Sequence, residues 1–243
     1  TVRECRTRGT VSGDACVGGL VGESYIGVIE RCCMAGGVSG TANVGGILGL
    51  NSGGFVDDCY TAAEVSAESC AGGAVGYNGP SCHCAVYQAG VVNRCYAAGP
   101  VSGGNAGGLV GVDDRGEVVN SFWNTEASGW TASAGGEGRT TSQMADASLY
   151  LTAGWDFVDE KVNGTWNVWY MPAVGDGPRL AWELVDGDFN ADVQVDFRDF
   201  SLLAARWRQE DSMDAPDSGY SVPDGVVDLD DLARFVEVWL AGR

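Results

Sequence analysis

The chain has 243 residues, a length that suits one large domain or a large domain with a small one. Its 33 acidic and 14 basic residues give a formal net charge of -19, which argues against a nucleic acid or an anionic membrane surface as partner because either would repel it. Its one histidine, His83, offers little to histidine-based catalysis or a histidine-rich metal site. No apolar run reaches membrane-spanning length, so we expect no membrane span.

Residues 1–125 repeat one pattern in four copies. These are "ECRTRGTVSGDACVGGLVG", "RCCMAGGVSGTANVGGILG", "DCYTAAEVSAESCAGGAVG" and "RCYAAGPVSGGNAGGLVG". Their first cysteines are Cys5, Cys32, Cys59 and Cys95, spaced 27, 27 and 36 residues apart, and a fifth, degenerate copy has Ser121 at this position. Such a period in a glycine-rich stretch predicts stacked β units. Helix is disfavoured, because glycine costs about 1 kcal/mol relative to alanine in a helix.

Alignment of the copies places equivalent residues in columns that are expected to run along the stack. Three columns are apolar and are predicted to face the core, with neighbours about 4.8 Å apart. Their members are Val11, Val38, Val65 and Val101; Leu20, Ile47, Ala74 and Leu109; and Ile29, Val56, Val92 and Val118. A fourth column consists of glycine, at Gly27, Gly54, Gly90 and Gly116, and predicts a tight turn or a positive φ in every copy.

All nine cysteines lie between residues 5 and 95. Their clustering indicates a disulfide framework formed in an oxidising compartment, with buried thiols in a cytosolic protein as the alternative. A second cysteine follows the first in two copies only, which predicts the pairs Cys5–Cys16 and Cys59–Cys70. Bridges between rungs of the stack, for example from Cys5 to Cys32, are the alternative. Because the count is odd, one thiol stays free or pairs with another chain.

The motif "VGGLVG", together with "CYAAGPVSG", resembles the GLUG repeat family over residues 1–125. The resemblance implies a non-catalytic, β-solenoid-like segment of a bacterial surface or secreted protein, used in adhesion or architecture. We therefore expect a mostly β chain, a glycine-rich β-solenoid with an aromatic cap and a small α calcium-binding loop–helix pair. The chain begins inside a repeat, and an open first rung would invite another protomer to complete it, the alternative being a chain shortened by processing.

Residues 126–185 are expected to form an aromatic capping segment. "GWDF", "TWNVWYMP" and "PRLAWE" resemble the segment that closes GLUG-type arrays, and large rings suit a plug over the end of the stack. An aromatic platform that binds carbohydrate is the alternative. Asp156, Asp159 and Glu160 have the residue types of a glycosidase pair, but in so acidic a chain they are better interpreted as solvated surface groups. "NGT" at Asn163 is a glycosylation sequon.

Residues 186–243 contain an acidic loop followed by an amphipathic helix pattern, twice. "DFNADVQVDFRD", residues 188–199, has the oxygen spacing of a twelve-residue calcium loop, although Val193 replaces its usual glycine. The predicted ligands are Asp188, Asn190, Asp192, the Gln194 carbonyl, Asp196 and Asp199 in the first loop, and Asp217, Asp224, the Val226 carbonyl, Asp228 and Asp231 in the second. Calcium is thus the expected cofactor, with one ion in the first loop and a second in the other.

This duplicated loop–helix pattern resembles a type I dockerin module over residues 186–241. The resemblance implies two calcium-loaded units that bind a cohesin partner on a scaffold or cell surface. The family's recognition positions are occupied here by Phe197 and Arg198 in the first loop, and by Leu229 and Asp230 in the second.

The sequence therefore predicts an extracellular or cell-surface protein that is not an enzyme. Its partner would be itself, in a head-to-tail homopolymer that extends into fibres, or a cohesin-like surface protein. An adhesin or carbohydrate-associated module with a glycan contact is the alternative function, and a polysaccharide-active enzyme is a third.

Overall fold

The computed structural model describes residues 1–80, 88–158, 160, 162–172, 177–183 and 197–205, and residues 232, 233, 236 and 239. The chain forms two compact units, Thr1–Trp155 and Asp156–Arg243. This boundary lies inside the segment 126–185 that the sequence sets apart, and it assigns residues 126–155 to the first unit. The expected limits at residues 125 and 185 stay a prediction.

The first unit consists of successive repeats of short strands. Repeat 1 contains β1 (Val2–Arg3), β2 (Arg6–Ser12), β3 (Ala15–Gly18) and β4 (Val21–Tyr25). Repeat 2 contains β5 (Val28–Glu30), β6 (Cys33–Gly40), β7 (Ala42–Gly45) and β8 (Leu48–Ser52). Repeat 3 contains β9 (Phe55–Asp57), β10 (Tyr60–Thr61), β11 (Glu64–Ala67), β12 (Cys70–Gly72) and β13 (Val75–Gly79). Repeat 4 contains β14 (Val91–Asn93), β15 (Tyr96–Ala97), β16 (Val101–Ser102), β17 (Asn105–Gly107) and β18 (Val110–Asp113).

The unit ends with a mixed segment of strands and short helices. It contains β19 (Glu117–Val119), β20 (Phe122–Asn124), α1 (Thr125–Ser128), β21 (Glu137–Arg139), α2 (Thr141–Met144) and α3 (Ala147–Thr152). Asn124 caps α1 with its side-chain oxygen, and Thr140 and Gln143 form a capping box at α2.

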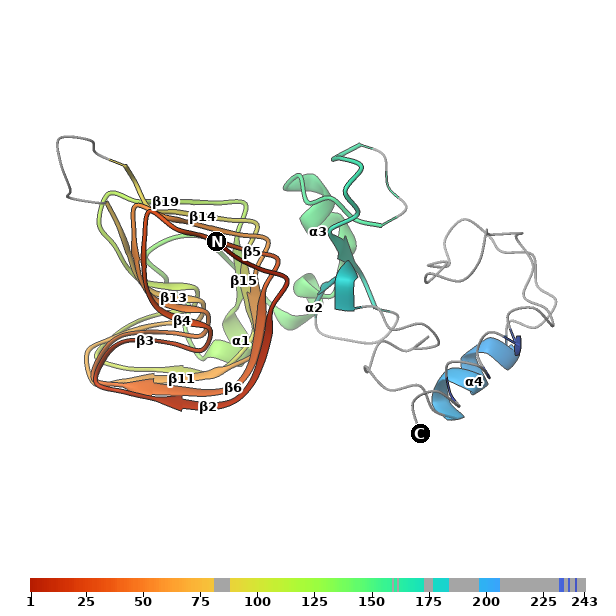
Figure 1. Ribbon diagram of the computed structural model, residues 1–243, viewed down its shortest axis with the longest axis horizontal. Helices are drawn as coiled ribbons and strands as arrows, with labels where there is room; N and C mark the ends of the chain where they lie inside the picture. Colours follow the sequence, from red (N-terminus) through yellow and green to blue (C-terminus); the bar gives the residue numbers. More distant parts are fainter. Residues whose placement is uncertain are drawn as a thin grey trace. The chain divides into compact units, whose positions relative to one another are not determined.

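Strands from successive repeats pair side by side and in parallel (Figure 1). One sheet has the order β1-β5-β9-β14-β19, a second β17-β12-β7-β3 and a third β18-β13-β8-β4. The fourth has the order β16-β11-β6-β10-β15-β20-β21, with β2 paired to β6. The chain is mostly β, as the sequence predicts.

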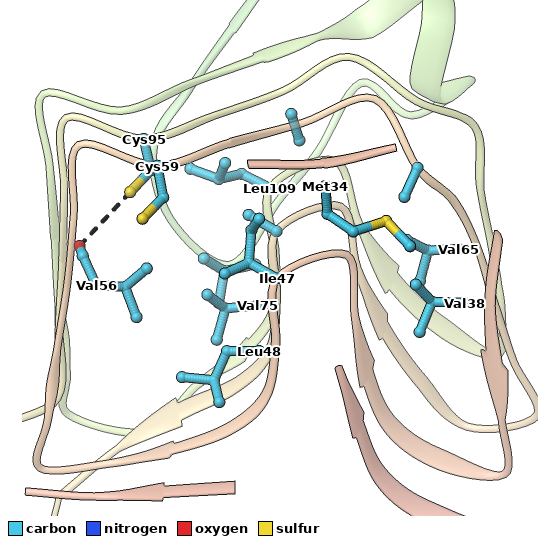
Figure 2. Close-up of a cluster of buried hydrophobic side chains, with 14 of the residues drawn as sticks. Met34, Val38, Ile47, Leu48, Val56, Cys59, Val65, Val75, Cys95 and Leu109 are labelled. Atoms are coloured by element: carbon cyan, nitrogen blue, oxygen red, sulfur yellow. Dashed lines mark hydrogen bonds between the residues drawn. The ribbon is translucent and has the colours of Figure 1, made fainter. Parts of the chain in front are cut away.

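The strand register confirms the apolar columns. Val38 pairs with both Val11 and Val65, and Val65 pairs with Val101. Val56 pairs with Ile29 and Val92 in the same way. Because the repeats stack in register, side chains of similar size lie above one another and exclude water from one core (Figure 2). The largest fully buried members drawn there are Met34, Ile47, Leu48 and Leu109.

The paired glycines of the "VGG" motif have a steric cause. At the first glycine of each pair, an added Cβ would lie within about 2 Å of a carbonyl oxygen three residues later in the same repeat. The contacts are Gly18 with Val21, Gly45 with Leu48, Gly72 with Val75 and Gly107 with Val110, at 1.9, 2.2, 1.9 and 1.9 Å. Since the obstacle is backbone, any side chain there would displace the turn between two sheets.

The sequence predicts a tight turn or a positive φ at the other glycine column, Gly27, Gly54, Gly90 and Gly116. None of these glycines has a positive φ, which belongs in three copies to the preceding residue, Ile26, Gly53 and Arg115. The column residues are small because polar side chains pack against their backbone: an added Cβ would lie 2.7 Å from Asn51 Oδ1 at Gly54 and 2.5 Å from Asn78 Oδ1 at Gly90. The column therefore marks close approach and not a special backbone angle.

Residues 130–134 cover the backbone edge of repeat 4. Gly108 N–H donates to the Ala132 carbonyl at 3.1 Å, and Ser133 Oγ accepts from Leu109 N–H and Val110 N–H at 3.2 and 2.9 Å. These bonds satisfy groups that an open edge would leave unpaired. Aromatic residues also cover this end, because Trp123 belongs to the core, Trp130 packs against it, and Trp130 Nε1 donates to the Val101 carbonyl at 2.8 Å.

The large aromatic residues of α3 and the segment after it pack elsewhere in this unit. Tyr150 and Trp155 are fully buried. Their rings lie against Tyr96 and Phe122, outward-facing members of the sheet formed by β15 and β20, with centroids 4.8–6.4 Å apart. Trp155 Nε1 also donates to the Asn120 carbonyl at 2.8 Å. The aromatic cluster thus covers a side of the stack.

The second unit contains an antiparallel pair and helical segments. β22 (Trp169–Tyr170) pairs with β23 (Arg179–Leu180), η1 spans Ala181–Glu183, and α4 spans Phe197–Ala205. A helix thus lies where the apolar stripe after Asp199 predicts one. Phe197 and Trp239, one from each predicted loop–helix unit, make an edge-to-face ring contact with centroids 4.9 Å apart.

Candidate functional site

An asparagine ladder, formed by Asn51, Asn78 and Asp113, runs through the interior of the stack. Asn51 Nδ2 donates to Asn78 Oδ1 at 2.9 Å, and Asn78 Nδ2 donates to Asp113 Oδ1 at 2.7 Å. Both asparagines are fully buried, so these bonds replace the water that each amide loses on folding. Burial raises the pKa of Asp113, while the bond from Asn78 opposes this shift. The ladder joins repeats 2, 3 and 4.

A charge column is formed by the residue before each repeat cysteine: Glu4, Arg31, Asp58, Arg94 and Asn120. Its four charged members alternate in sign, and every member has a positive φ between 46° and 51°. Arg31 pairs with Glu4 at 3.2 Å, and Arg94 Nε donates to Asp58 Oδ1 at 2.8 Å. Alternation lets each repeat attract the next one, which compensates for a backbone conformation that non-glycine residues rarely adopt.

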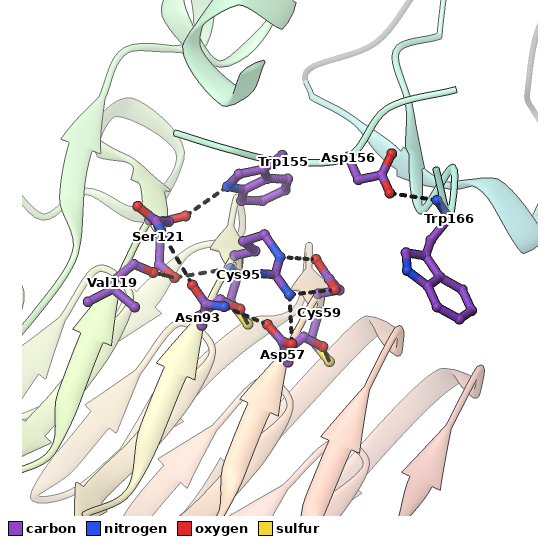
Figure 3. Close-up of polar contacts among 12 residues, drawn as sticks. Asp57, Cys59, Asn93, Cys95, Val119, Ser121, Trp155, Asp156 and Trp166 are labelled. Atoms are coloured by element: carbon purple, nitrogen blue, oxygen red, sulfur yellow. Dashed lines mark hydrogen bonds and ion pairs between the residues drawn. The ribbon is translucent and has the colours of Figure 1, made fainter. Parts of the chain in front are cut away.

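Arg94 also contacts the neighbouring column. Its Nη2 donates to Asp57 Oδ2 at 2.7 Å, and Asn93 Nδ2 donates to Asp57 Oδ1 at 2.9 Å (Figure 3). Burial, followed by the charge of Asp58, raises the pKa of Asp57 to about 6, and Arg94 opposes this shift. The same contacts raise the pKa of Arg94, which stays charged.

A cysteine column, formed by Cys5, Cys32, Cys59 and Cys95, lies directly beside the charge column. Cys32 N–H donates to Cys59 Sγ at 3.4 Å, and Cys95 Sγ donates to the Val56 carbonyl at 3.5 Å (Figure 2). Cys32, Cys59 and Cys95 are fully buried, and Cys5 is partly exposed. The thiol of Cys59 lowers the pKa of Cys32 to about 7, whereas burial raises that of Cys59.

Ser121 continues the cysteine column, as the alignment of the fifth copy predicts. Its Oγ accepts a hydrogen bond from Cys95 N–H at 3.0 Å. Cys16 and Cys70 belong to a different column on the β3–β7–β12–β17 sheet, where asparagine alternates with cysteine. The structure therefore brings the four first cysteines together and places the expected partners of Cys5 and Cys59 on another sheet. All seven cysteines of the described residues are thiols here, and the pairs Cys5–Cys16 and Cys59–Cys70 stay a prediction.

A groove of about 500 Å³ lies between the outer face of β20–β21 and the helices α2 and α3. Its polar lining is mixed. It is formed by Asn120, Glu137, Arg139, Gln143, Asp146, Ser148 and Thr152, with Phe122, Leu149 and Ala153 as the apolar part. The guanidinium of Arg139 lies over the ring of Phe122, 5.6 Å from its centroid, and pairs with the carboxylate of Glu137.

Helix capping orients part of the groove. Asp146 caps α3 by accepting from Ser148 N–H at 2.9 Å, which lowers the pKa of its carboxyl. Gln143 Oε1 accepts from Thr140 N–H at 3.0 Å, so the amide NH₂ of Gln143 keeps its donors for other partners. Hydroxyl, amide, carboxylate and guanidinium groups thus line the groove beside an aromatic ring.

Asp156 and Glu160, which have the residue types of a glycosidase pair, accept backbone hydrogen bonds within a loop of the second unit. Asp156 Oδ2 accepts from Trp166 N–H at 2.8 Å, and Glu160 accepts from Val162 N–H and Asn163 N–H at 2.6 and 2.9 Å. Asp159 lies outside the described residues. The sequon residue Asn163 is partly exposed, and the indole of Trp166 is 80% exposed.

The predicted calcium ligands lie outside the described residues, and the side chain of Asp199 is likewise not described, although its backbone belongs to α4. Among the described residues, no group of three or more His, Cys, Asp or Glu side chains is arranged to hold a metal ion. The calcium sites therefore stay a prediction from loop spacing.

The sequence analysis does not predict the asparagine ladder or the charge column. Both nevertheless correspond to a regular pattern in the sequence. Each ladder residue follows the first glycine of a glycine pair by six residues, as Asn51 follows Gly45, Asn78 follows Gly72 and Asp113 follows Gly107. In the charge column, the residue before cysteine alternates between acid and base. Polar residues at a fixed register would have indicated contacts between repeats.

Comparison with known proteins gives a limited result. No family model matches the chain, and no solved structure matches it. The chain is similar to a protein of Evansella cellulosilytica named "Putative Gly-rich membrane protein", with 36% identity over 76 residues. The match covers 28% of this chain and 9% of that protein, so the chain spans a small part of its relative's length. No helix of the described residues is long and apolar enough to cross a membrane.

Proposed function

We propose that this protein is a secreted, non-catalytic structural protein: a β-solenoid subunit that assembles through a calcium-stabilised, dockerin-like tail. The observation that supports this most is that polar side chains of the stack bond to one another between repeats. In the asparagine ladder and the charge column, amides, carboxylates and guanidinium groups bond to the equivalent position of the next repeat. Groups engaged in this way stabilise the stack and are not free for catalysis.

In the proposed assembly, the strands of repeat 1 provide the contact to a second copy. The strands β1, β3 and β4 are the outermost members of their sheets among the described residues, and β2 pairs there with β6 alone. A strand of another copy can add to such an edge in parallel and in register. The charge column would set the register of the added strand, because the carboxylate of Glu4 favours a cation at the equivalent position of that strand.

The calcium-loaded tail provides the second proposed contact. Its support is the loop spacing and the contact between Phe197 and Trp239, which brings the two predicted loop–helix units together in one unit. An edge on one unit and a docking module on the other are different surfaces. A contact between them is head-to-tail and extends into a filament instead of closing as a dimer.

Electron microscopy in negative stain, with calcium and then with EDTA, tests this proposal. Filaments that form with calcium and disperse with EDTA are expected. The variant Asp192→Ala, which removes one predicted calcium ligand, should prevent them, whereas Glu64→Ala, an exposed acid of repeat 3, should leave them unchanged. Particles that stay single with calcium would refute assembly.

A second function, binding of a neutral glycan, is favoured by the groove. Sugars offer both donor and acceptor hydroxyls, which the mixed lining can match, while Glu137 and Asp146 disfavour an anionic ligand. Calorimetry with neutral oligosaccharides tests this function. Arg139→Ala should weaken binding at least tenfold, and Arg115→Ala, an exposed arginine outside the groove, should not. Equal affinities for both variants, or no binding by the native protein, would refute it.

A further inference from the structure

The cysteine column places four thiols in succession along the stack. Its members occupy equivalent positions in repeats 1 to 4. The backbone bonds around them run in register: Cys33 N–H donates to the Cys5 carbonyl at 2.9 Å, and Tyr60 N–H and Tyr96 N–H donate to the carbonyls of Cys32 and Cys59 at 3.0 and 3.1 Å. Neighbouring members are therefore one strand spacing apart.

We propose that the cysteine column carries two disulfide bonds between repeats, Cys5–Cys32 and Cys59–Cys95. Parallel strands lie about 4.8 Å apart, which falls within the range of about 4.4–6.8 Å that joins the Cα atoms of a disulfide. The thiols project from the same side of successive strands: Cys59 Sγ accepts from Cys32 N–H at 3.4 Å and donates to the Ile29 carbonyl of repeat 2, and Cys95 Sγ donates to the Val56 carbonyl of repeat 3. Bond formation would turn each thiol from a backbone carbonyl toward the sulfur of the neighbouring repeat.

The composition of the column favours this pairing. It contains four cysteines and ends at Ser121, so pairing from Cys5 onward leaves no thiol over. A single Cys32–Cys59 bond would instead isolate a thiol at each end. In the other column, the neighbour of Cys16 is Asn43, whose Nδ2 lies 4.0 Å from Cys16 Sγ, and Asn105 follows Cys70. Thiols there are separated by asparagine and cannot bond to an adjacent repeat.

The chemistry requires a disulfide oxidant, such as oxidised glutathione, and two exchange steps for each bond. A thiolate of the column first attacks the glutathione disulfide, forming a mixed disulfide and releasing one reduced glutathione. The neighbouring thiol, after losing its proton, then attacks the column sulfur of that mixed disulfide and releases the second glutathione. Cys5 is partly exposed and gives the oxidant access to the first pair. Cys59 and Cys95 are fully buried, so their bond forms before repeats 3 and 4 have packed.

Peptide mapping of the full chain tests the proposal. The protein is refolded in a glutathione redox buffer, its remaining thiols are alkylated, and it is digested without reduction. Trypsin alone leaves Cys32 and Cys59 on one peptide, so a second protease that cuts at Asp57 and Asp58 is needed. Mass spectrometry should find peptides linked through Cys5–Cys32 and Cys59–Cys95.

Two variants distinguish the alternatives. The double variant Cys16→Ser and Cys70→Ser should keep both links, because it leaves the column intact. Cys95→Ser should lose the Cys59 link and keep Cys5–Cys32, which shows that the pairs form independently. Links from Cys5 to Cys16 or from Cys59 to Cys70, a Cys32–Cys59 link, or alkylation of all four column thiols in the native protein would each overturn the proposal.

Discussion

Asn51 donates a hydrogen bond to Asn78 from the equivalent position of the preceding repeat, at 2.9 Å and with both side chains fully buried. Asn78 in turn donates a hydrogen bond to Asp113, so the amide of Asn78 connects three repeats. Within a stack held chiefly by apolar contacts, this bond is directional and fixes which residue lies above which.

Asn78→Ala should lower the free energy of unfolding by about 2 kcal/mol, because it leaves the buried amide of Asn51 and the partly exposed carboxyl of Asp113 without their shared partner. Asn78→Asp should be at least as harmful at neutral pH, since it sets a second carboxylate against Asp113. Urea unfolding followed by circular dichroism measures both. A midpoint equal to that of the native protein would show that the ladder does not stabilise the stack.

The pKa of Asp57 predicts a pH dependence of stability. Its carboxyl has a pKa of about 6 in the folded protein against an ordinary value of 3.8, so between these values the folded state binds more protons than the unfolded state. The contribution of Asp57 is therefore greatest at low pH and is lost as the pH rises from about 4 to 6. Asp57→Asn should remove this part of the loss.

Urea midpoints at pH 4.5 and pH 7 measure the effect of Asp57→Asn. Asp58→Asn is the matched control, because Asp58 is the adjacent acid and also pairs with Arg94. It should lower stability at neutral pH by about 1 kcal/mol by weakening a partly buried ion pair. Parallel pH profiles for the native protein and Asp57→Asn would contradict the assignment.

Two glycines of repeat 2 should respond to alanine in opposite ways. At Gly45 the new Cβ would lie 2.2 Å from the Leu48 carbonyl oxygen and would meet backbone of repeat 3, so Gly45→Ala should cost about 3 kcal/mol. At Gly37 the nearest atoms belong to the side chain of Thr10 at 3.7 Å, an ordinary contact, so Gly37→Ala should be neutral or slightly stabilising. Thermal unfolding of both variants measures this difference, and equal melting temperatures would refute the steric explanation.

Removal of calcium should act on residues 186–243 alone. Without the ion, the carboxylates of each predicted loop repel one another, while the first unit is stabilised by its own core. Hydrogen exchange measured with and without EDTA should show faster exchange in the tail and unchanged protection in β1–β18. Simultaneous loss of protection in both regions would contradict this independence.

Much of the repeat architecture could be predicted because its cause is periodic. An apolar residue at the same place in every copy has to face the core in every copy, so the columns of Val38, Ile47 and Val56 follow from alignment. Helix α4 follows in the same way from the spacing of its apolar residues. The position of the aromatic residues 150 and 155 could not be deduced, since their composition suits the end or the side of a stack equally well.

Alignment by itself determined the period, the apolar columns and the place of Ser121 among the cysteines, because each depends only on equivalent positions in the chain. Only the tertiary structure decided which side chains touch within and between columns. Cys5 lies nearer to Cys16 in the chain, yet it is stacked with Cys32, because strand pairing brings equivalent residues of successive repeats within one strand spacing. The same pairing places the carbonyl oxygen of Gly27 within 2.7 Å of where a Cβ on Gly54 would lie, a contact between repeats that no single repeat contains.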